Sequence, residues 1–241
     1  MNDPSTIVLS SQVALLRMTD MLANNLSNLS TNGFKGQEML FEEYLGEASD
    51  GKQASYVQDI GTARDLREGP ITQTNNPLDV AIQGSGYLVV QTPLGPRYTR
   101  DGHFQIDAQG QIVTSQGYAV QSDANTPIVI PDGTRKITIG KDGSVVTADG
   151  AIAGKLQLVD FADDQKLLPV GSNLFSSDQT PQPASANTTV AQGALEGSNV
   201  EPVLEITRLI AANRALTYNH DFTNAEATRV SNAIDHLGKT V

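Results

Sequence analysis

The sequence has no cysteine and no tryptophan, and it has only 5% aromatic residues among its 241. Without cysteine the chain cannot form disulfides, a thiol nucleophile or a cysteine-based zinc site. Basic residues are also scarce, with 16 Lys and Arg against 27 Asp and Glu. A formal net charge of −11 leaves no basic surface for the phosphates of nucleic acid. We therefore expect no nucleic-acid partner.

Long apolar runs are missing as well. No stretch of about 18 apolar residues occurs that could span a membrane as a helix, so we expect no membrane span. Residues 1–30 also lack the pattern of a secretory signal peptide, because polar residues such as Arg17 and Asp20 interrupt the apolar ones. The sequence predicts a cytoplasmic protein or one exported without a cleaved signal peptide.

The motifs of catalysis and cofactor binding are absent too. The sequence contains no GxSxG elbow, no P-loop and no GxGxxG. His220 and His236 stand too far apart on one predicted helix to share a metal, and His103 lies in a predicted turn. We predict no enzyme activity, no cofactor and no catalytic, cofactor-binding or metal site.

Glycine and proline divide the chain into helical ends and a turn-rich middle. Neither residue occurs in 5–32 or 203–237. The sequence predicts an α+β fold in which long N- and C-terminal helices pair as a coiled coil, with a central antiparallel all-β domain between them in the sequence. The predicted ranges are the N-terminal helix 1–33, a linker 34–69, the β domain 70–197 and the C-terminal helix 198–241.

The N-terminal segment has residues typical of the start and the end of a helix. Asp3 suits the N-cap and Pro4 the first helical position, while Gly33 suits a left-handed residue after the helix end. Apolar residues recur every seven positions, and a second set falls between them, which is an a/d pattern. The two sets are Val8, Leu15, Leu22 and Leu29, and Ser11, Met18 and Asn25.

The C-terminal segment predicts a longer helix. It begins either at a capping box over residues 198–201 or with Pro202 as the first helical residue. From Ile206 to Leu237, seam residues alternate at steps of three and four. A helix of that length measures on the order of 50 Å at about 1.5 Å per residue, so it needs a partner along its length.

The middle of the chain has the pattern of short antiparallel strands. Residues 79–90 are two apolar runs around Gly-Ser-Gly, and residues 155–161 alternate with period two. Two hairpins are indicated, 104–106 with 112–113 and 137–139 with 145–146, the second around an Asp-Gly turn. We expect residues 176–192 to form a polar loop.

The terminal helices allow two interpretations. They can pair within one chain as an antiparallel hairpin, or they can assemble with helices of other subunits. Amides in a helical seam favour the second, because they can satisfy mixed surfaces against several neighbours. These amides belong to Asn24, Asn25, Asn28, Asn32, Asn213 and Asn219.

Four stretches carry a family resemblance. ANNLSNLSTNGFK (23–35) resembles the N-terminal signature of the flagellar axial proteins, which are the rod, hook and junction families. PLDVAIQGSGYLVVQ (77–91), YTRDGHFQIDAQGQIVT (98–114) and EGSNVEPVLEITRLIAANRALTYN (196–219) resemble the rod and hook group in the same order. The short length points to the rod. Residues 77–104 and 193–200 are most similar to proximal rod subunits, with distal rod subunits close behind.

The resemblance implies a structural subunit of the flagellar basal-body rod. Its terminal helices would form an inner coiled-coil layer around the export channel, and its β domain would lie outside. Its partners would be copies of itself, other rod subunits and the flagellar type III export apparatus. It would be located in the periplasmic rod and would transmit torque.

The expected assembly interface combines the helical seams with the exit from the N-terminal helix. Gly33 would supply a left-handed turn there and Phe34 would anchor the linker, so Gly33→Val should block assembly and leave the β domain folded. We also expect the helices to be poorly ordered in the isolated protein. The interface residues are Leu15, Met18, Leu22, Asn24, Asn25, Leu26, Asn28, Leu29, Thr31, Asn32, Gly33, Phe34, Asn199, Val200, Ile206, Leu209, Ile210, Asn213, Arg214 and Leu216.

Two other classes compete with this interpretation. A secreted β-domain adhesin or binding module could use coiled-coil termini to oligomerise, but it would need an exposed aromatic cluster, and the sequence has six Tyr and no Trp. An enzyme would need a nucleophile or His-carboxylate constellation, which the sequence does not offer.

Overall fold

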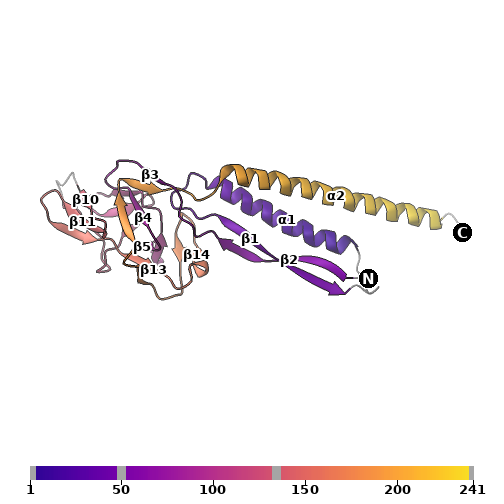
Figure 1. Cartoon of the computed structure of the whole chain (residues 1–241), viewed down its shortest axis with the longest axis horizontal. Coiled ribbons are helices and arrows are strands. Elements are labelled where there is room, and N and C mark those ends of the chain that lie inside the picture. Colours follow the sequence, from indigo (N-terminus) through magenta and orange to yellow (C-terminus); the bar gives the residue numbers. More distant parts are fainter. Residues whose placement is uncertain (1–3, 48–52, 132–136, 239–241) are drawn as a thin grey trace. The chain divides into compact units, whose positions relative to one another are not determined.

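The computed structural model describes residues 4–47, 53–131 and 137–238. The chain divides into two compact units. Unit 1 comprises Met1–Ser27, Gln37–Arg64 and Glu201–Val241, and unit 2 comprises Asn28–Gly36 and Asp65–Val200. Helices at the two ends and antiparallel strands between them confirm the predicted α+β class (Figure 1).

Unit 1 contains helices α1 (Pro4–Ser27) and α2 (Pro202–Gly238). Each begins at a proline, since the fixed φ of proline suits the first turn and its missing N–H is not needed there. This confirms Pro202 as the start of the second helix. The expected cap Asp3 lies outside the described residues.

Helix α1 ends at Ser27, six residues before the predicted boundary at 33. The residues that follow form turns in unit 2. Thr31 donates its backbone N–H to the Asn28 carbonyl at 3.1 Å and its hydroxyl to the Asn28 side chain at 3.0 Å. Short polar side chains compete in this way with helical hydrogen bonding, which explains why the Asn- and Ser-rich segment stops the helix early.

The predicted linker 34–69 is wrong over most of its length, because it contains a long hairpin in unit 1. Strands β1 (Gln37–Glu47) and β2 (Gln53–Arg64) pair antiparallel. The register shifts between Leu40 and Phe41. Such a bulge breaks the two-residue alternation by which a strand is recognised in a sequence.

Among the side chains that the structure describes, which leave out those of residues 41–60, unit 1 has one small apolar cluster. Its cluster consists of Met21, Leu22 and Ala212, with Leu15, Met18, Met39 and Leu209 packed against it. Helix α1 runs alongside both α2 and the hairpin, and α2 continues past the N-terminal end of α1 (Figure 1). Side chains of α2 from 220 to 236 are exposed apart from a half-buried Glu226. Unit 1 therefore leaves much of its helical surface uncovered.

Unit 2 is built of short antiparallel strands and one 3-10 turn, η1 (Asp164–Lys166). Its strands are β3 (Ile71–Gln73), β4 (Val80–Gln83), β5 (Tyr87–Thr92), β6 (Gly95–Thr99), β7 (Phe104–Ile106), β8 (Ile112–Thr114), β9 (Ala119–Val120), β10 (Ile137–Ile139), β11 (Ser144–Thr147), β12 (Ile152–Lys155), β13 (Leu158–Asp160), β14 (Leu168–Pro169), β15 (Phe175–Ser176), β16 (Gln182–Pro183), β17 (Thr189–Gln192) and β18 (Ala194–Glu196). The largest sheet has the order β14-β15-β6-β5-β9-β8-β7, with β13 and β16 attached to it through β5.

Both predicted hairpins are confirmed, since β7 pairs with β8 and β10 with β11. The two runs in 79–90 are β4 and β5, which belong to different sheets. The single strand predicted over 155–161 is wrong. Leu156 and Gln157 donate their N–H groups to Gly143 and Gln121, and this turn of the backbone separates β12 from β13. The predicted loop 176–192 is interrupted by strands, since it contains all of β16 and β17.

Two apolar clusters fill unit 2. The larger joins β4, β5, β7, β8, β10 and β11, with Val80, Ile82, Leu88, Val90, Phe104, Ile112, Val120, Ile128, Ile130, Ile137, Ile139, Val145, Leu156, Leu174 and Val190. The smaller contains three aromatic residues in addition to Tyr87, which packs between Phe161 and Phe175 at ring-centroid distances of 6.1 and 5.9 Å. Unit 2 therefore has substantial apolar cores of its own.

Candidate assembly site

The inner faces of the two helices meet in unit 1. Of the predicted interface residues, Leu15, Met18, Leu22 and Leu209 belong to this interior. Leu22 is 1% exposed, and Leu26 and Leu216 are half-buried. These side chains therefore already pack against other residues of the same chain.

Asn25 is buried in the same interior and has a definite structural role. Its side-chain oxygen accepts from the N–H of Gln37 at 2.9 Å, and its amide nitrogen donates to the Gln37 carbonyl at 2.8 Å. The amide nitrogen also donates to Glu205 at 3.0 Å. Asn25 thus joins α1 to the start of the hairpin and to the first turn of α2.

Other seam asparagines also find partners in their own chain. Asn219 donates to the Ser11 hydroxyl at 3.0 Å, joining α2 to α1, and Asn213 donates to the Leu209 carbonyl at 2.9 Å within α2. The amides of these residues and of Asn25 therefore each have a partner within the chain. Whether they also contact neighbouring subunits stays a prediction.

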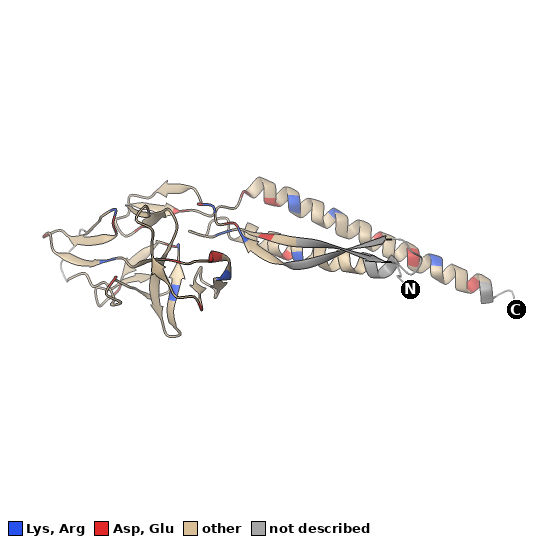
Figure 2. Cartoon of the chain, turned by 60° about the horizontal axis from the view of Figure 1, so that its bottom comes forward, with Lys and Arg blue, Asp and Glu red and all other residues tan. Residues whose placement is uncertain are grey.

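The outward face of α1 is apolar. Leu9, Val13 and Leu16 are all more than 40% exposed, and they follow one another at helical spacing. The helix holds only one basic and one acidic residue, Arg17 and Asp20. Helix α2 differs, since Figure 2 shows both basic and acidic residues along its described length. A helix facing water on one side ordinarily carries a polar face there, so this face of α1 has the composition of a covered one.

Helix α2 also has an outward apolar face near its start. Val203, Ile206 and Ile210 are exposed, with Val203 at 79%. The predicted interface residues Asn24, Asn213 and Arg214 are exposed as well. Further along α2, large apolar side chains remain exposed at Tyr218, Phe222, Val230 and Ile234.

Sequence reasoning missed part of this surface. Leu9, Val13, Leu16 and Val203 were not among the predicted interface residues. A signal was present, because Leu9, Val13 and Leu16 are spaced i, i+4 and i+7. They form a second apolar stripe beside the one that faces the partner helix.

The remaining predicted residues lie in unit 2 around the exit from α1. Gly33 has φ +65°, so the predicted left-handed turn is confirmed, although it stands six residues beyond the helix end. A β-carbon at Gly33 would lie 2.6 Å from the carbonyl carbon of Arg100. Its N–H donates to the Glu196 carbonyl at 2.8 Å. The other residues in this region are Asn28, Leu29, Thr31, Asn32, Phe34, Asn199 and Val200.

A buried charge cluster that sequence reasoning missed lies beside Gly33. The Glu196 carboxylate accepts from Lys35 Nζ at 2.7 Å and from Arg100 Nε at 2.7 Å. All three side chains are at most 5% exposed. Each lies within one of the stretches that carry the family resemblance, which was the only available signal.

The charges in this cluster shift the pKa values of its members. Burial acts to raise the pKa of Glu196, but Arg100 and Lys35 outweigh it, so the pKa lies below its usual value. Burial lowers the pKa of Lys35, and the hydrogen bond to Glu196 opposes that shift. A carboxylate between two cations is therefore the stable arrangement at neutral pH.

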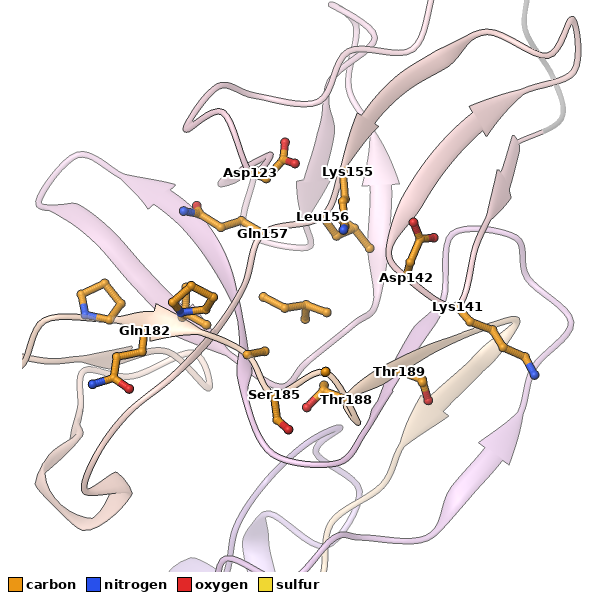
Figure 3. A pocket seen from close by; sticks show the side chains of 16 residues that line it. Asp123, Lys141, Asp142, Lys155, Leu156, Gln157, Gln182, Ser185, Thr188 and Thr189 are labelled. Atoms are coloured by element: carbon orange, nitrogen blue, oxygen red, sulfur yellow. The ribbon is translucent and has the colours of Figure 1, made fainter.

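Unit 2 also has a groove of about 620 Å³ between β12, β13 and residues 181–189. Figure 3 shows its charged side chains, two lysines and two aspartates, Lys141, Lys155, Asp123 and Asp142. No histidine occurs among the described residues that line it. Across the described part of the chain, no group of three potential metal ligands comes together.

Within the described ranges, neither helix combines the length and hydropathy needed to cross a bilayer. This agrees with the mixed composition of both helices.

Comparison with known proteins identifies the family. Two family models match, "Flagellar hook protein FlgE/F/G D1 domain" over residues 81–147 and "Flagellar basal body rod FlgEFG protein C-terminal" over residues 191–219. The first lies in unit 2, and the second spans β18 and the first half of α2.

Curated relatives match over nearly the whole chain. The flagellar basal-body rod protein FlgF of Caulobacter vibrioides is 36% identical over 246 residues, covering 99% of both chains. FlgF of Mesorhizobium japonicum is 32% identical, again covering 99% of both. The rod protein FlgG of Caulobacter vibrioides is 36% identical and covers 83% of this chain and 86% of its own. With helices at both ends, a β unit between them and this end-to-end similarity, the chain belongs to the flagellar basal-body rod protein family.

Proposed function

We propose that the protein is a structural subunit of the bacterial flagellar basal-body rod, of the proximal FlgF type, which polymerises through its terminal helices. The observation that carries this proposal is the uncovered apolar surface of α1 and α2. Leu9, Val13 and Leu16 on one helix and Val203, Ile206 and Ile210 on the other are exposed in the single chain. The FlgF relatives support the subtype, because they match end to end.

The occupants of these faces are helices of neighbouring subunits, both copies of this chain and other rod proteins. Each helix then has two seams, one toward its partner in the same chain and one toward a neighbour. A coiled-coil layer built in this way would surround the export channel, and the β unit would lie outside it. The rod would transmit torque from motor to hook, and no catalysis is needed for that role.

The location follows from the role. A rod subunit functions in the basal body, and we place this one in its periplasmic rod. The flagellar type III export apparatus would deliver it, passing an unfolded or partly folded chain through a narrow channel.

The test changes one exposed position on α2. Ile210→Asp changes an exposed side chain, so the isolated protein should keep its stability within about 0.5 kcal/mol, as surface substitutions do. In a cell lacking the wild-type protein, the variant should fail to build rods, because a carboxylate would be buried at the neighbour's helix. Rods are counted in purified basal bodies, and swimming is scored on soft agar.

The matched control is Ile152→Asp in unit 2, where the side chain is 73% exposed and lies outside the proposed interface. It should leave rods and swimming unchanged. If Ile210→Asp cells assembled rods in wild-type number, helix-mediated polymerisation through this face would be refuted. If both variants failed equally, the loss would have to be ascribed to export or solubility.

The adhesin interpretation gains no support from the aromatic cluster of unit 2. The aromatic residues at the centre of unit 2, among them Tyr87, Tyr98 and Phe161, are buried against one another. They are not free to form a ligand platform.

A further inference from the structure

All chain connections between the two units pass through three short segments of unit 2. These are residues 28–36 after α1, residues 65–69 after the hairpin, and residues 196–200 before α2. Whatever position unit 1 takes, these segments set the points at which the chain leaves unit 2. We infer that Glu196 is a positioning residue that fastens the three exit segments to one another.

The first line of evidence is the set of bonds made by the Glu196 carboxylate. One oxygen accepts from Lys35 Nζ at 2.7 Å, in the first segment, and from the N–H of Gly69 at 3.1 Å, in the second. The other oxygen accepts from Arg100 Nε at 2.7 Å. A single side chain from the third segment therefore holds the other two and also holds the β unit.

The two cationic side chains also donate hydrogen bonds to backbone carbonyls. Lys35 Nζ also donates to the Arg67 carbonyl at 2.7 Å. Arg100 donates from its two terminal nitrogens to the carbonyls of Gly86 at 3.0 Å and Gly84 at 3.1 Å. Because guanidinium donors form a rigid planar fork, Arg100 fixes the direction of its carboxylate partner as well as its distance.

Asn199 adds a second tie between the same segments. Its side-chain oxygen accepts from the N–H of Gly36 at 2.7 Å, and its nitrogen donates to the carbonyls of Asp65 at 2.8 Å and Arg67 at 3.0 Å. One amide thus bonds all three segments at the level where the chain leaves unit 2.

Close backbone approaches show that the exit segments have little freedom. A β-carbon on Gly69 would lie 2.1 Å from the carbonyl oxygen of Gly197, and one on Gly33 would lie 2.6 Å from Arg100. Only glycine permits these approaches. The glycines bring the backbones together, and the carboxylate with its two cations holds them in register.

A buried ion triad of this kind suits a positioning role better than a stabilising one. Apolar replacements of buried ion pairs are often neutral or favourable, because desolvation offsets the attraction. What an ion triad adds is directional bonding, which apolar contacts do not provide. The consequence for the rod rests on the proposed function, since fixed exit points would let the β layer and the helical layer move together.

The test uses trypsin on the purified full-length protein, because two residues of the site are themselves cleavage positions. Lys35 is buried and hydrogen-bonded, whereas Lys141 is exposed. In the wild type, the Lys35–Gly36 bond should be cut at least tenfold more slowly than the Lys141–Asp142 bond. Fragment masses over time give both rates in one digest.

Glu196→Gln keeps the side-chain shape and removes the charge. The Lys35–Gly36 bond should then be cut at least tenfold faster than in the wild type, with the Lys141–Asp142 rate unchanged. Asp123→Asn, an exposed carboxylate elsewhere in unit 2, is the charge-matched control and should change neither rate. Glu196→Asp, which keeps the charge on a shorter stem, should give an intermediate rate at Lys35.

Two results would overturn the inference. One is an unchanged rate at Lys35 in Glu196→Gln, which would mean that the carboxylate does not hold the exit segments. The other is a rise at Lys141 equal to that at Lys35 in both Glu196 variants, which would mean that the residue supports the whole β unit. The digest requires no rod assembly, so it can fail or succeed independently of the proposed function.

Discussion

Unit 1 and unit 2 belong to the same chain but differ in how many apolar side chains they bury. Unit 2 buries fifteen apolar residues in one cluster and seven in another. Among the side chains that the structure describes, the cluster of unit 1 buries three, and the helices carry exposed Leu, Ile, Val and aromatic side chains. Unit 2 therefore has a core of its own, whereas we propose that the exposed helical surface of unit 1 is covered by neighbouring subunits.

We expect the largest effect from truncating a core side chain in each unit, which tests the difference between the two units. Leu88 is fully buried in unit 2, so Leu88→Ala should cost about 2–5 kcal/mol of unfolding free energy. Leu22→Ala removes a side chain that is equally buried, in unit 1. We expect it to leave the unfolding transition of unit 2 in place, as measured by denaturant titration. A shared transition that both variants shift alike would contradict this difference between the two units.

The next largest effect concerns the left-handed glycine at the exit from α1. Gly33→Ala should destabilise unit 2 by more than Gly117→Ala does. Both glycines have positive φ, +65° and +84°, but a β-carbon at Gly117 meets nothing within 4 Å. The Gly117 variant thus reports backbone strain alone, about 1–2 kcal/mol, and the excess at Gly33 reports the contact with Arg100. Equal melting shifts would mean that the close approach relaxes freely.

This comparison changes what is expected of Gly33→Val. The variant should still block assembly, but unit 2 should also lose stability, because Gly33 packs within it. The thermal midpoint of the purified variant, followed by circular dichroism, measures that loss. Normal motility in a strain that carries Gly33→Val would contradict the role of this turn.

A smaller effect is expected from acid. The pKa of Glu196 is lower in the folded protein than its usual value of 4.5. Its contribution to stability is therefore complete above about pH 4.5 and is lost as the pH falls through the folded pKa. Denaturant titrations between pH 7 and pH 3 should show a fall below pH 4.5 that is shallower in Glu196→Gln. If the unfolding free energy fell equally with acid in the two proteins, the carboxylate would not be ionised between its cations.

The smallest effect should come from the bond between Asn219 and Ser11. Asn219→Ala removes one hydrogen bond that joins α2 to α1, which is ordinarily worth about 0.5–1.5 kcal/mol. Because the bond lies in unit 1, thermal melting of unit 2 should not change. Hydrogen exchange of α1 around Ser11 should accelerate modestly, and no acceleration would show that the helices do not pair there in solution.

The sequence was informative where a single local pattern decides the structure. The absence of glycine and proline predicted both helices, and Asp-Gly and Gly-containing turns predicted the β7–β8 and β10–β11 hairpins. The hairpin of β1 and β2 was missed because its bulge at Leu40 and Phe41 breaks the strand period. Local pattern cannot report an irregularity of pairing.

The sequence indicated which elements form the candidate site, but not which of their residues are buried and which are exposed. Family resemblance pointed to the helices, yet periodicity could not separate Leu209, which packs inside unit 1, from Ile210, which is exposed. The Glu196 cluster was out of reach, because Lys35 and Arg100 stand 161 and 96 residues away from it. Which charges become buried together is decided by topology, and no local spacing encodes it.

Hydrogen–deuterium exchange of the purified full-length protein, read by mass spectrometry, tests the central claim most directly. If the exposed helical surface of unit 1 is covered only by neighbouring subunits, amides of α2 beyond residue 220 should exchange within seconds, because an uncovered helix is marginal in water. Amides of β5 and β8 in unit 2 should stay protected for hours. Protection of the second half of α2 equal to that of β5 in the isolated protein would contradict the account.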